Sequence, residues 1–261
     1  MKVLLDTGDC DTGFDISLVW QIGEAVVKVK MPEPGVTREH VTMEEVRKRN
    51  FTFRISEVYY HMEFQGLYYI VTSKAPGVPL WQAWRSFDWD TKHFVTNRVA
   101  EICIELATWK GKTISGVDGN YLGDVLLSPL VPGSYPCEYN LDCEATLQSA
   151  RRKGLDCSSL VFYHCDLSSA NIIIDVKTKS FTVIDWEMAG FVPRDYVATR
   201  FCLAPALATT GGQKDRLWPN AITSKLAESG FKEVSEEFLY LWREEEGIPQ
   251  PSTLSNSCIV Q

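Results

Sequence analysis

The sequence predicts an α+β fold, with antiparallel strands in the first part of the chain and helices in the second. Two observations support this. Short β-branched and aromatic runs dominate the first 75 residues, whereas an apolar stripe at helical spacing occupies residues 93–110. Because strands and helices are segregated rather than alternating, the pattern favours α+β over a doubly wound parallel sheet.

The first part is expected to form a five-stranded antiparallel sheet with one helix. Two neighbouring β-branched runs are separated by Ile22-Gly23-Glu24, and two later runs are joined through Gln65-Gly66, so each pair reads as a hairpin. A charged stretch at residues 41–49 predicts a short helix between them. The four strand-like runs are residues 17–21, 25–30, 55–61 and 67–72.

A break at residues 75–79, which contain two prolines and a glycine, marks the predicted boundary between the two parts. We therefore expect an N-terminal part at residues 1–74 and a C-terminal part at residues 75–261, with a flexible tail from residue 248. Within the second part, apolar runs at residues 172–174 and 181–184 flank a polar turn. They predict a second, smaller hairpin.

Composition and charge narrow the classes of function. The 261 residues include 26 Lys and Arg against 34 Asp and Glu, a formal net charge of -8 that disfavours nucleic acid as a partner. No run of about 18 apolar residues is present, so no membrane span is expected. The eight cysteines form no C-x-x-C pair, which indicates free thiols in a cytoplasmic protein.

One constellation of polar residues carries chemistry. Asp166 and Asn171 lie on the stretch that enters the predicted small hairpin, and Asp185 directly follows its second strand. Pairing of the two strands would bring Asn171 and Asp185 together at the open end, where their oxygens would suit Mg²⁺. Asp166 could accept a proton from an incoming hydroxyl, or orient that hydroxyl, while the metal holds phosphates.

The spacing His164-x-Asp166-x-x-x-x-Asn171, followed by Ile184-Asp185-Trp186-Glu187, resembles the aminoglycoside phosphotransferase-like family of the protein-kinase-like fold. The fungal branch of that family is the nearest in character. Further segments match in the family's order. These are Ala25-Val-Val-Lys28-Val, Tyr69-Ile-Val, Pro76-Gly77 and Gly116-Val117-Asp118-Gly119.

The resemblance implies a two-lobed fold and a role for each matching residue. Lys28 would contact the nucleotide phosphates, with Lys30 as its rival on the same strand face, and Glu44 or Glu45 would pair with the lysine. Thr72, Ser73 and Lys74 would line the adenine edge. Asp166 would be the catalytic base, Asn171 and Asp185 the Mg²⁺ ligands, and His164 a support for the loop backbone.

The implied function is Mg²⁺-ATP-dependent transfer of a phosphoryl group to a hydroxyl of a small molecule. The acidic chain leaves a cationic acceptor, such as an aminoalcohol or aminoglycoside, open. Two alternatives also stay open: a repurposed enzyme of secondary metabolism that catalyses a different reaction, and a non-catalytic binding module. The acidic loop at residues 6–13, which lacks the G-x-G-x-x-G pattern, and Ser73 in the hinge favour the binding module.

The last four residues, Cys258-Ile259-Val260-Gln261, fit a prenylation signal. No polybasic segment accompanies them, and one lipid anchors a protein weakly, so a chance match is the better interpretation. We expect a monomer or a dimer with a small-molecule substrate.

Overall fold

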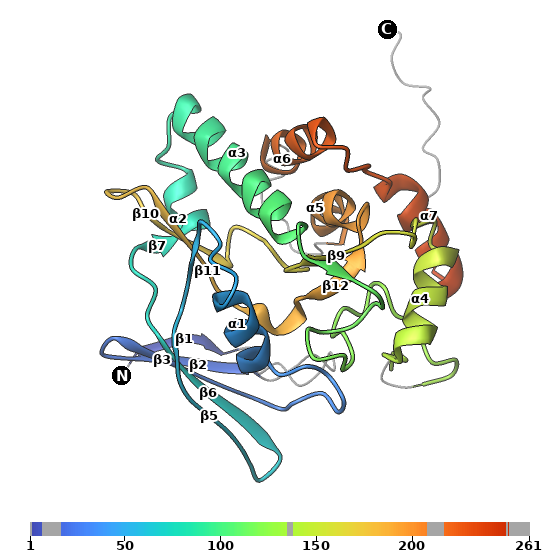
Figure 1. Cartoon of the computed structure of the whole chain (residues 1–261), viewed down its shortest axis with the longest axis horizontal. Helices are drawn as coiled ribbons and strands as arrows, with labels where there is room; N and C mark the ends of the chain where they lie inside the picture. The colour runs from blue at the N-terminus through green and yellow to red at the C-terminus, as the bar shows by residue number, and fades with distance from the viewer. Residues whose placement is uncertain (1, 7–16, 135–137, 208–216, 249, 251–261) are drawn as a thin grey trace, which may run out of the picture.

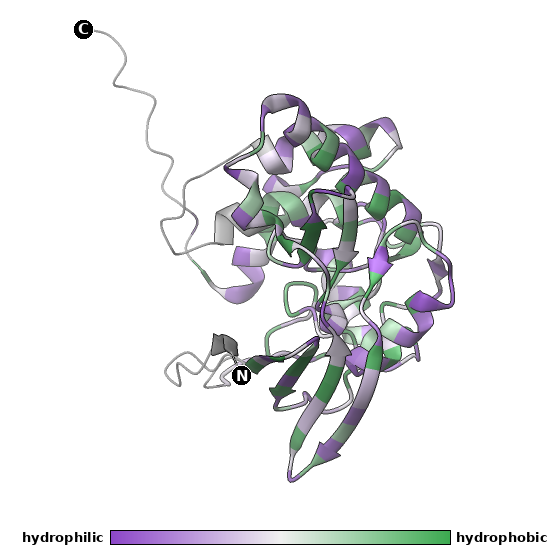
Figure 2. Cartoon of the chain, turned by 90° about the vertical axis from the view of Figure 1, so that its left-hand side faces the viewer, coloured by the Kyte–Doolittle hydropathy of each residue, from purple (hydrophilic) through white to green (hydrophobic). Residues whose placement is uncertain are grey.

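The computed structural model of the chain describes residues 2–6, 17–134, 138–207, 217–248 and 250. The first part forms a five-stranded antiparallel sheet in the order β1-β2-β3-β6-β5 (Figure 1). Hydrophobic and hydrophilic positions are interleaved along its long strands (Figure 2), as the two-residue period of a half-buried strand requires. The strands are β1 (Lys2–Asp6), β2 (Ser17–Ile22), β3 (Ala25–Lys30), β5 (Val58–Phe64) and β6 (Leu67–Ser73).

Helix α1 (Glu39–Arg47) begins two residues before the predicted start and also ends two residues earlier than expected. Arg38 at its N-cap is still extended, with φ of -73° and ψ of 143°, so Glu39 occupies the first turn. Met43 and Val46 anchor the helix in the core, being 2% and 0% exposed. This earlier start places Glu39, rather than the later glutamates, beside the sheet.

The predicted small hairpin is confirmed. Strands β10 (Ile172–Asp175) and β11 (Ser180–Val183) pair in antiparallel register, with Ile172 opposite Val183. Two short strands extend this hairpin into a sheet of order β4-β11-β10-β7, namely β4 (Arg54–Ile55) and β7 (Val78–Pro79). Both come from before or within the proline-rich break, so this small sheet joins segments far apart in the sequence.

Gly77, in the break, is required by its surroundings. Its φ is 113°, and a Cβ atom there would run into the backbone carbonyl of Ile174 on β10. Only glycine combines this backbone conformation with so close an approach. The conformation lets β7 pair with β10.

The second part is mainly helical and packs around a small sheet of order β12-β9-β8. Among the described residues, the longest helix is α3 (Trp89–Leu106). It starts four residues before the apolar stripe because the Asp88 side chain caps it by accepting from the backbone N–H of Thr91. Helix α4 (Cys143–Arg152) is capped by the Asp142 side chain, which accepts from the backbone N–H groups of Glu144 and Ala145. The remaining elements are α2 (Leu80–Trp84), β8 (Lys110–Gly111), β9 (Leu160–Tyr163), η1 (Trp186–Met188), β12 (Gly190–Pro193), α5 (Tyr196–Leu207), α6 (Leu217–Glu228) and α7 (Ser235–Glu246).

The core surrounds the segment that follows the small hairpin. Trp186 is completely buried, and its ring lies between those of Phe53 and Phe162, at centroid distances of 6.1 and 6.4 Å. This packing fixes the residues on either side of Trp186, which are acidic. Among the described residues, no helix combines the length and apolarity needed to cross a membrane.

Candidate functional site

The open end of the small hairpin places Asn171 and Asp185 close together. The backbone N–H of Ile184 donates to the carbonyl of Asn171 at 3.0 Å, so Asp185 follows the last paired residue directly. Asp185 has φ of 66° and ψ of 64°, a left-handed conformation that an aspartate tolerates better than most residues. The chain therefore turns sharply between β11 and η1.

Asp166 and Asn171 are linked within the loop that enters the hairpin. The Asn171 side-chain N–H groups donate to the Asp166 carboxylate at 2.7 Å and to its backbone carbonyl at 2.8 Å. Burial raises the pKa of Asp166 above its ordinary value, against the opposing effect of the nearby Arg200 charge. A carboxylate with a raised pKa is better suited to accept a proton than an ordinary exposed aspartate.

His164 supports the loop backbone, as the resemblance implied. Its Nε2 lies 3.0 Å from the carbonyl oxygen of Ile184, and its Nδ1 accepts from the backbone N–H of Asp166 at 3.3 Å. Because a carbonyl can only accept, the ring proton resides on Nε2. Burial lowers the pKa of His164 to about 4, so the ring is neutral at physiological pH. It holds two segments of the site together.

Lys28, on β3, lies in the same site. Its Nζ is 2.6 Å from Asp185, 2.5 Å from Glu187 and 3.3 Å from Glu39. Burial disfavours the charged form of Lys28, but the three carboxylates outweigh that effect and raise its pKa well above the ordinary value. Lys30 Nζ also reaches Glu187, at 3.1 Å.

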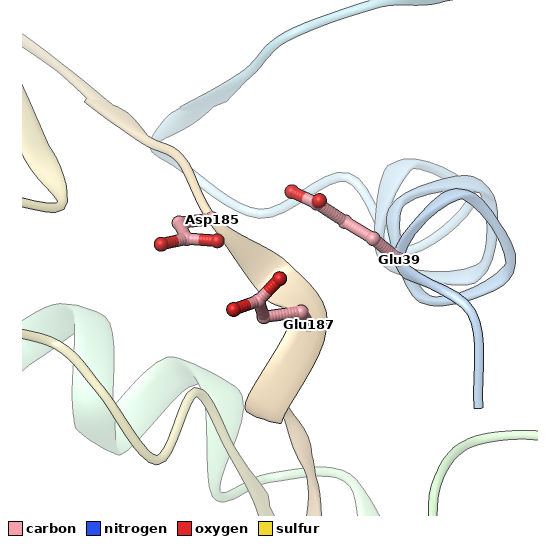
Figure 3. Close-up of side chains that lie close together, drawn as sticks. All are labelled: Glu39, Asp185 and Glu187. Atoms are coloured by element: carbon pink, nitrogen blue, oxygen red, sulfur yellow. The ribbon is translucent and has the colours of Figure 1, made fainter. Parts of the chain in front are cut away.

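The prediction that Glu44 or Glu45 pairs with Lys28 is wrong, because Glu39 takes that place. Glu44 is exposed, and Glu45 instead contacts Lys48 at 2.6 Å on the outer face of α1. Glu39 is buried in the first turn of the helix, facing the site (Figure 3). Acidic residues are common in the first turn of a helix, which could have pointed to Glu39. Using that signal required the correct start of α1, at Glu39 rather than at residue 41.

Thr72, Ser73 and Lys74 lie where β6 ends. The Ser73 backbone N–H donates to the carbonyl of Glu57, and the Lys74 N–H donates to that of Glu24, both at 2.8 Å. Both backbone N–H groups therefore donate to other segments of the chain, which holds residues 72–74 in place. Whether the three residues line an adenine remains a prediction.

Three acidic residues around Lys28 could offer ligand atoms to a divalent cation. Glu39, Asp185 and Glu187 each offer a carboxylate oxygen, and these atoms lie within 4.8 Å of one another (Figure 3). The side-chain N–H groups of Asn171 are engaged with Asp166, which leaves its amide oxygen as the ligand atom. Such hard oxygen donors suit Mg²⁺. Glu187 was singled out in the sequence without a role, and Glu39 was missed.

A cavity of about 200 Å³ adjoins Asp166. Its lining includes Arg200 and Phe201 from α5 and Trp218 from α6, together with residues of the loop that carries Asp166. It lies where a molecule could approach the Asp166 carboxylate. The acidic loop at residues 6–13 and the Cys258-Ile259-Val260-Gln261 signal lie outside the residues whose side chains the structure describes.

No protein-family model matches the sequence, and no curated protein sequence matches it. Solved structures do match. An aminoglycoside phosphotransferase, APH(3'')-Id from Streptomyces rimosus, is 15% identical over 95% of this chain and 93% of its own, with a TM-score of 0.53. The same enzyme in complex with ADP and streptomycin gives 15% identity, coverage of 88% and 89%, and a TM-score of 0.55. The streptomycin–ATP–APH(2'')-IIa ternary complex is 14% identical over 94% of this chain and 80% of its own, with a TM-score of 0.54.

At these identities the likeness concerns the fold. It confirms the kinase-like fold that the motifs predicted, whereas the fungal branch remains a prediction. The chain has the fold of the aminoglycoside phosphotransferases.

Proposed function

We propose that this protein is a Mg²⁺-ATP-dependent phosphotransferase that acts on a hydroxyl group of a small molecule. The observation that carries the proposal is the contact of Lys28 with Asp185, 2.6 Å long, at the open end of the hairpin that also presents Asn171. The fold supports it, because matching structures were solved with ATP or ADP and an aminoglycoside.

Each residue then has a role in positioning and charge stabilisation. Asp166 accepts or orients the proton of the acceptor hydroxyl. Asn171 and Asp185 would hold Mg²⁺, which when bound neutralises charge on the phosphates. Lys28 steadies the phosphates, and Glu39 orients Lys28.

In this proposal residues 1–74 form the nucleotide-binding lobe, with Thr72, Ser73 and Lys74 beside the adenine, and residues 75–261 form the catalytic lobe. The cytoplasmic location, a place in secondary metabolism and a monomeric or dimeric state accompany this proposal as predictions. The described cysteines support the location, since all five are free thiols.

Calorimetric titration of ATP with and without Mg²⁺ tests the nucleotide and metal site. Wild-type protein should bind ATP in a Mg²⁺-dependent manner, and Asp185→Asn should weaken that binding at least tenfold. Asp175→Asn is the matched control, because Asp175 lies at the turn end of the same hairpin, away from its open end. Wild-type protein that binds no ATP when Mg²⁺ is present would remove the proposal.

Turnover tests the role of Asp166 and separates the enzyme from a binding module. With a panel of hydroxyl compounds and ATP, we expect ADP release that Asp166→Asn lowers by roughly 10²- to 10⁴-fold, the usual contribution of a general base. Turnover unchanged in this variant would refute the assignment. Mg²⁺-dependent ATP binding without any turnover would favour the binding module.

A further inference from the structure

The cavity beside Asp166 is lined by both apolar and charged side chains. Tyr163, Leu167, Phe201 and Trp218 supply apolar and aromatic surface, and Asp166 and Arg200 supply the charges. At about 200 Å³ it is smaller than the roughly 300–1,000 Å³ of typical small-molecule sites, so it suits a compact group. The apolar lining suits a hydrocarbon or aryl body better than a polyhydroxylated ring.

Arg200 is the cationic side chain of this lining, and its side chain is only 15% exposed. Its Nη2 lies 3.8 Å from the nearer oxygen of Asp166, which is beyond hydrogen-bonding distance. Its Nε is buried and has no hydrogen-bond partner among the described residues. A buried donor without a partner destabilises the folded protein, so a ligand oxygen that engages this guanidinium would recover free energy.

A second carboxylate, that of Asp124, lies near Arg200 and is completely buried. Its hydrogen bonds come from elsewhere. The Tyr196 hydroxyl donates to one oxygen at 2.7 Å, and the Leu126 backbone N–H donates to the other at 3.1 Å. Asp124 therefore balances the charge of Arg200 without a direct ion pair among the described contacts, and the guanidinium keeps donors for a planar, two-oxygen partner.

We propose that this cavity is the acceptor subsite and that Arg200 selects an acceptor carrying a carboxylate near its hydroxyl, attached to an apolar or aryl body. The inference rests on the proposed phosphotransferase function and names its substrate class. Asp166 takes the hydroxyl proton, the hydroxyl oxygen forms a bond to the γ-phosphorus of ATP, and the bond from that phosphorus to the bridging oxygen breaks to release ADP. A polycationic aminoglycoside would place like charge against Arg200.

The test compares matched compounds that differ in charge. The probes are 3-phenyllactate, mandelate and 3-hydroxybutyrate, each beside its neutral amide and its cationic amino-alcohol analogue. Binding is measured by saturation-transfer NMR and calorimetry without nucleotide. We expect wild-type protein to bind at least one acid tenfold or more tightly than its amide, and the amino alcohol least tightly.

Variants then attribute this preference to Arg200. Arg200→Gln should remove the ratio between acid and amide, and Arg200→Lys should keep part of it, because lysine retains the charge without the planar fork. The matched control is Arg194→Gln. Arg194 stacks on the aromatic ring of Phe231 and lies outside the cavity lining.

If Arg200→Gln folds poorly, wild-type protein alone still tests the inference, because the affinities for the acid, the amide and the amino alcohol can be compared without any variant. Equal binding of acids and amides, or tighter binding of the amino alcohols, would overturn the inference while leaving Mg²⁺-dependent ATP binding intact. Acid preference that Arg200→Lys retains in part, in a protein that binds no ATP, would support carboxylate binding by Arg200 and overturn the phosphotransferase function, and with it the role of the cavity as an acceptor subsite.

Discussion

At the scale of single residues, the site depends on His164 in a neutral form with one proton position. Its two ring nitrogens bridge the carbonyl of Ile184, beside the metal-ligand candidate Asp185, and the backbone N–H of Asp166. Protonation of Nδ1 would break the contact with Asp166, because that nitrogen could no longer accept. The histidine thus couples the geometry of the loop to pH.

The titration of His164 predicts that the protein loses stability at acidic pH. The pKa of His164 is lowered from 6.5 to about 4 in the folded protein, so the unfolded chain binds more protons between these values. Stability is therefore lost as pH falls from about 6.5 to 4, by about 3 kcal/mol from this group. We expect the free energy of unfolding of wild-type protein to exceed that of His164→Asn by about 3 kcal/mol less at pH 4 than at pH 7. Urea unfolding at the two pH values measures this. A difference independent of pH would contradict this.

At the scale of elements, helix α1 decides which glutamate reaches the lysine of β3. The helix buries Glu39, Met43 and Val46 on one face and leaves Glu44 exposed. Glu39 Oε1 accepts from the backbone N–H of Trp186 at 3.2 Å, and Oε2 lies 3.3 Å from Lys28. One helical turn therefore connects the five-stranded sheet to the segment after the small hairpin.

Two substitutions in α1 separate this role from general helix charge. Glu39→Gln should weaken Mg²⁺-ATP binding about tenfold, because Lys28 loses a charge partner that orients it, a loss of about 1.4 kcal/mol. Glu44→Gln, in the same helix but exposed, should change the affinity less than twofold. Calorimetry on both variants checks this, and equal effects would show that α1 acts only through its overall charge.

At the scale of the whole molecule, the N-terminal part, which contains the five-stranded sheet and α1, is joined to the rest of the chain by polar contacts as well as packing. Besides those of Lys28, the Thr37 hydroxyl donates to Asp118 at 2.5 Å, and the Arg49 guanidinium stacks 3.4 Å from the centre of the Trp109 ring. In the proposed function the nucleotide and metal bind across this junction. Binding to the folded state alone must stabilise the entire chain.

Saturating Mg²⁺-ATP should therefore raise the unfolding temperature. At a ligand concentration of about 100 times Kd the gain is about 2.7 kcal/mol. For a chain of this size that corresponds to a rise of roughly 5–10 °C. Differential scanning calorimetry should show the rise in wild-type protein and in Asp175→Asn, and at least halve it in Asp185→Asn, since a tenfold weaker Kd leaves about 1.4 kcal/mol at the same ligand concentration. A similar rise in all three proteins would place the nucleotide elsewhere.

Much of the fold and part of the site could be predicted from local patterns. The order of strands and helices follows from hydrophobic periodicity, and the hairpin of β10 and β11 follows from two apolar runs around a polar turn. Both depend on neighbouring residues. Helix limits were less predictable, because the residue before each helix sets where it starts. Arg38 is still extended, so α1 starts at Glu39, and the Asp88 side chain caps α3.

The sequence by itself determined the α+β fold class and the meeting of Asn171 with Asp185, because a hairpin register is set within a dozen residues. Only the tertiary structure decided that Glu39 reaches Lys28, that Glu187 joins them, and that Arg200 faces Asp166. The contacts of Glu187 and Arg200 join residues far apart in the chain, and the contact of Glu39 with Lys28 depends on how α1 packs beside β3. No local pattern specifies such packing, since a charged residue on a helix reads the same whether it faces solvent or a site.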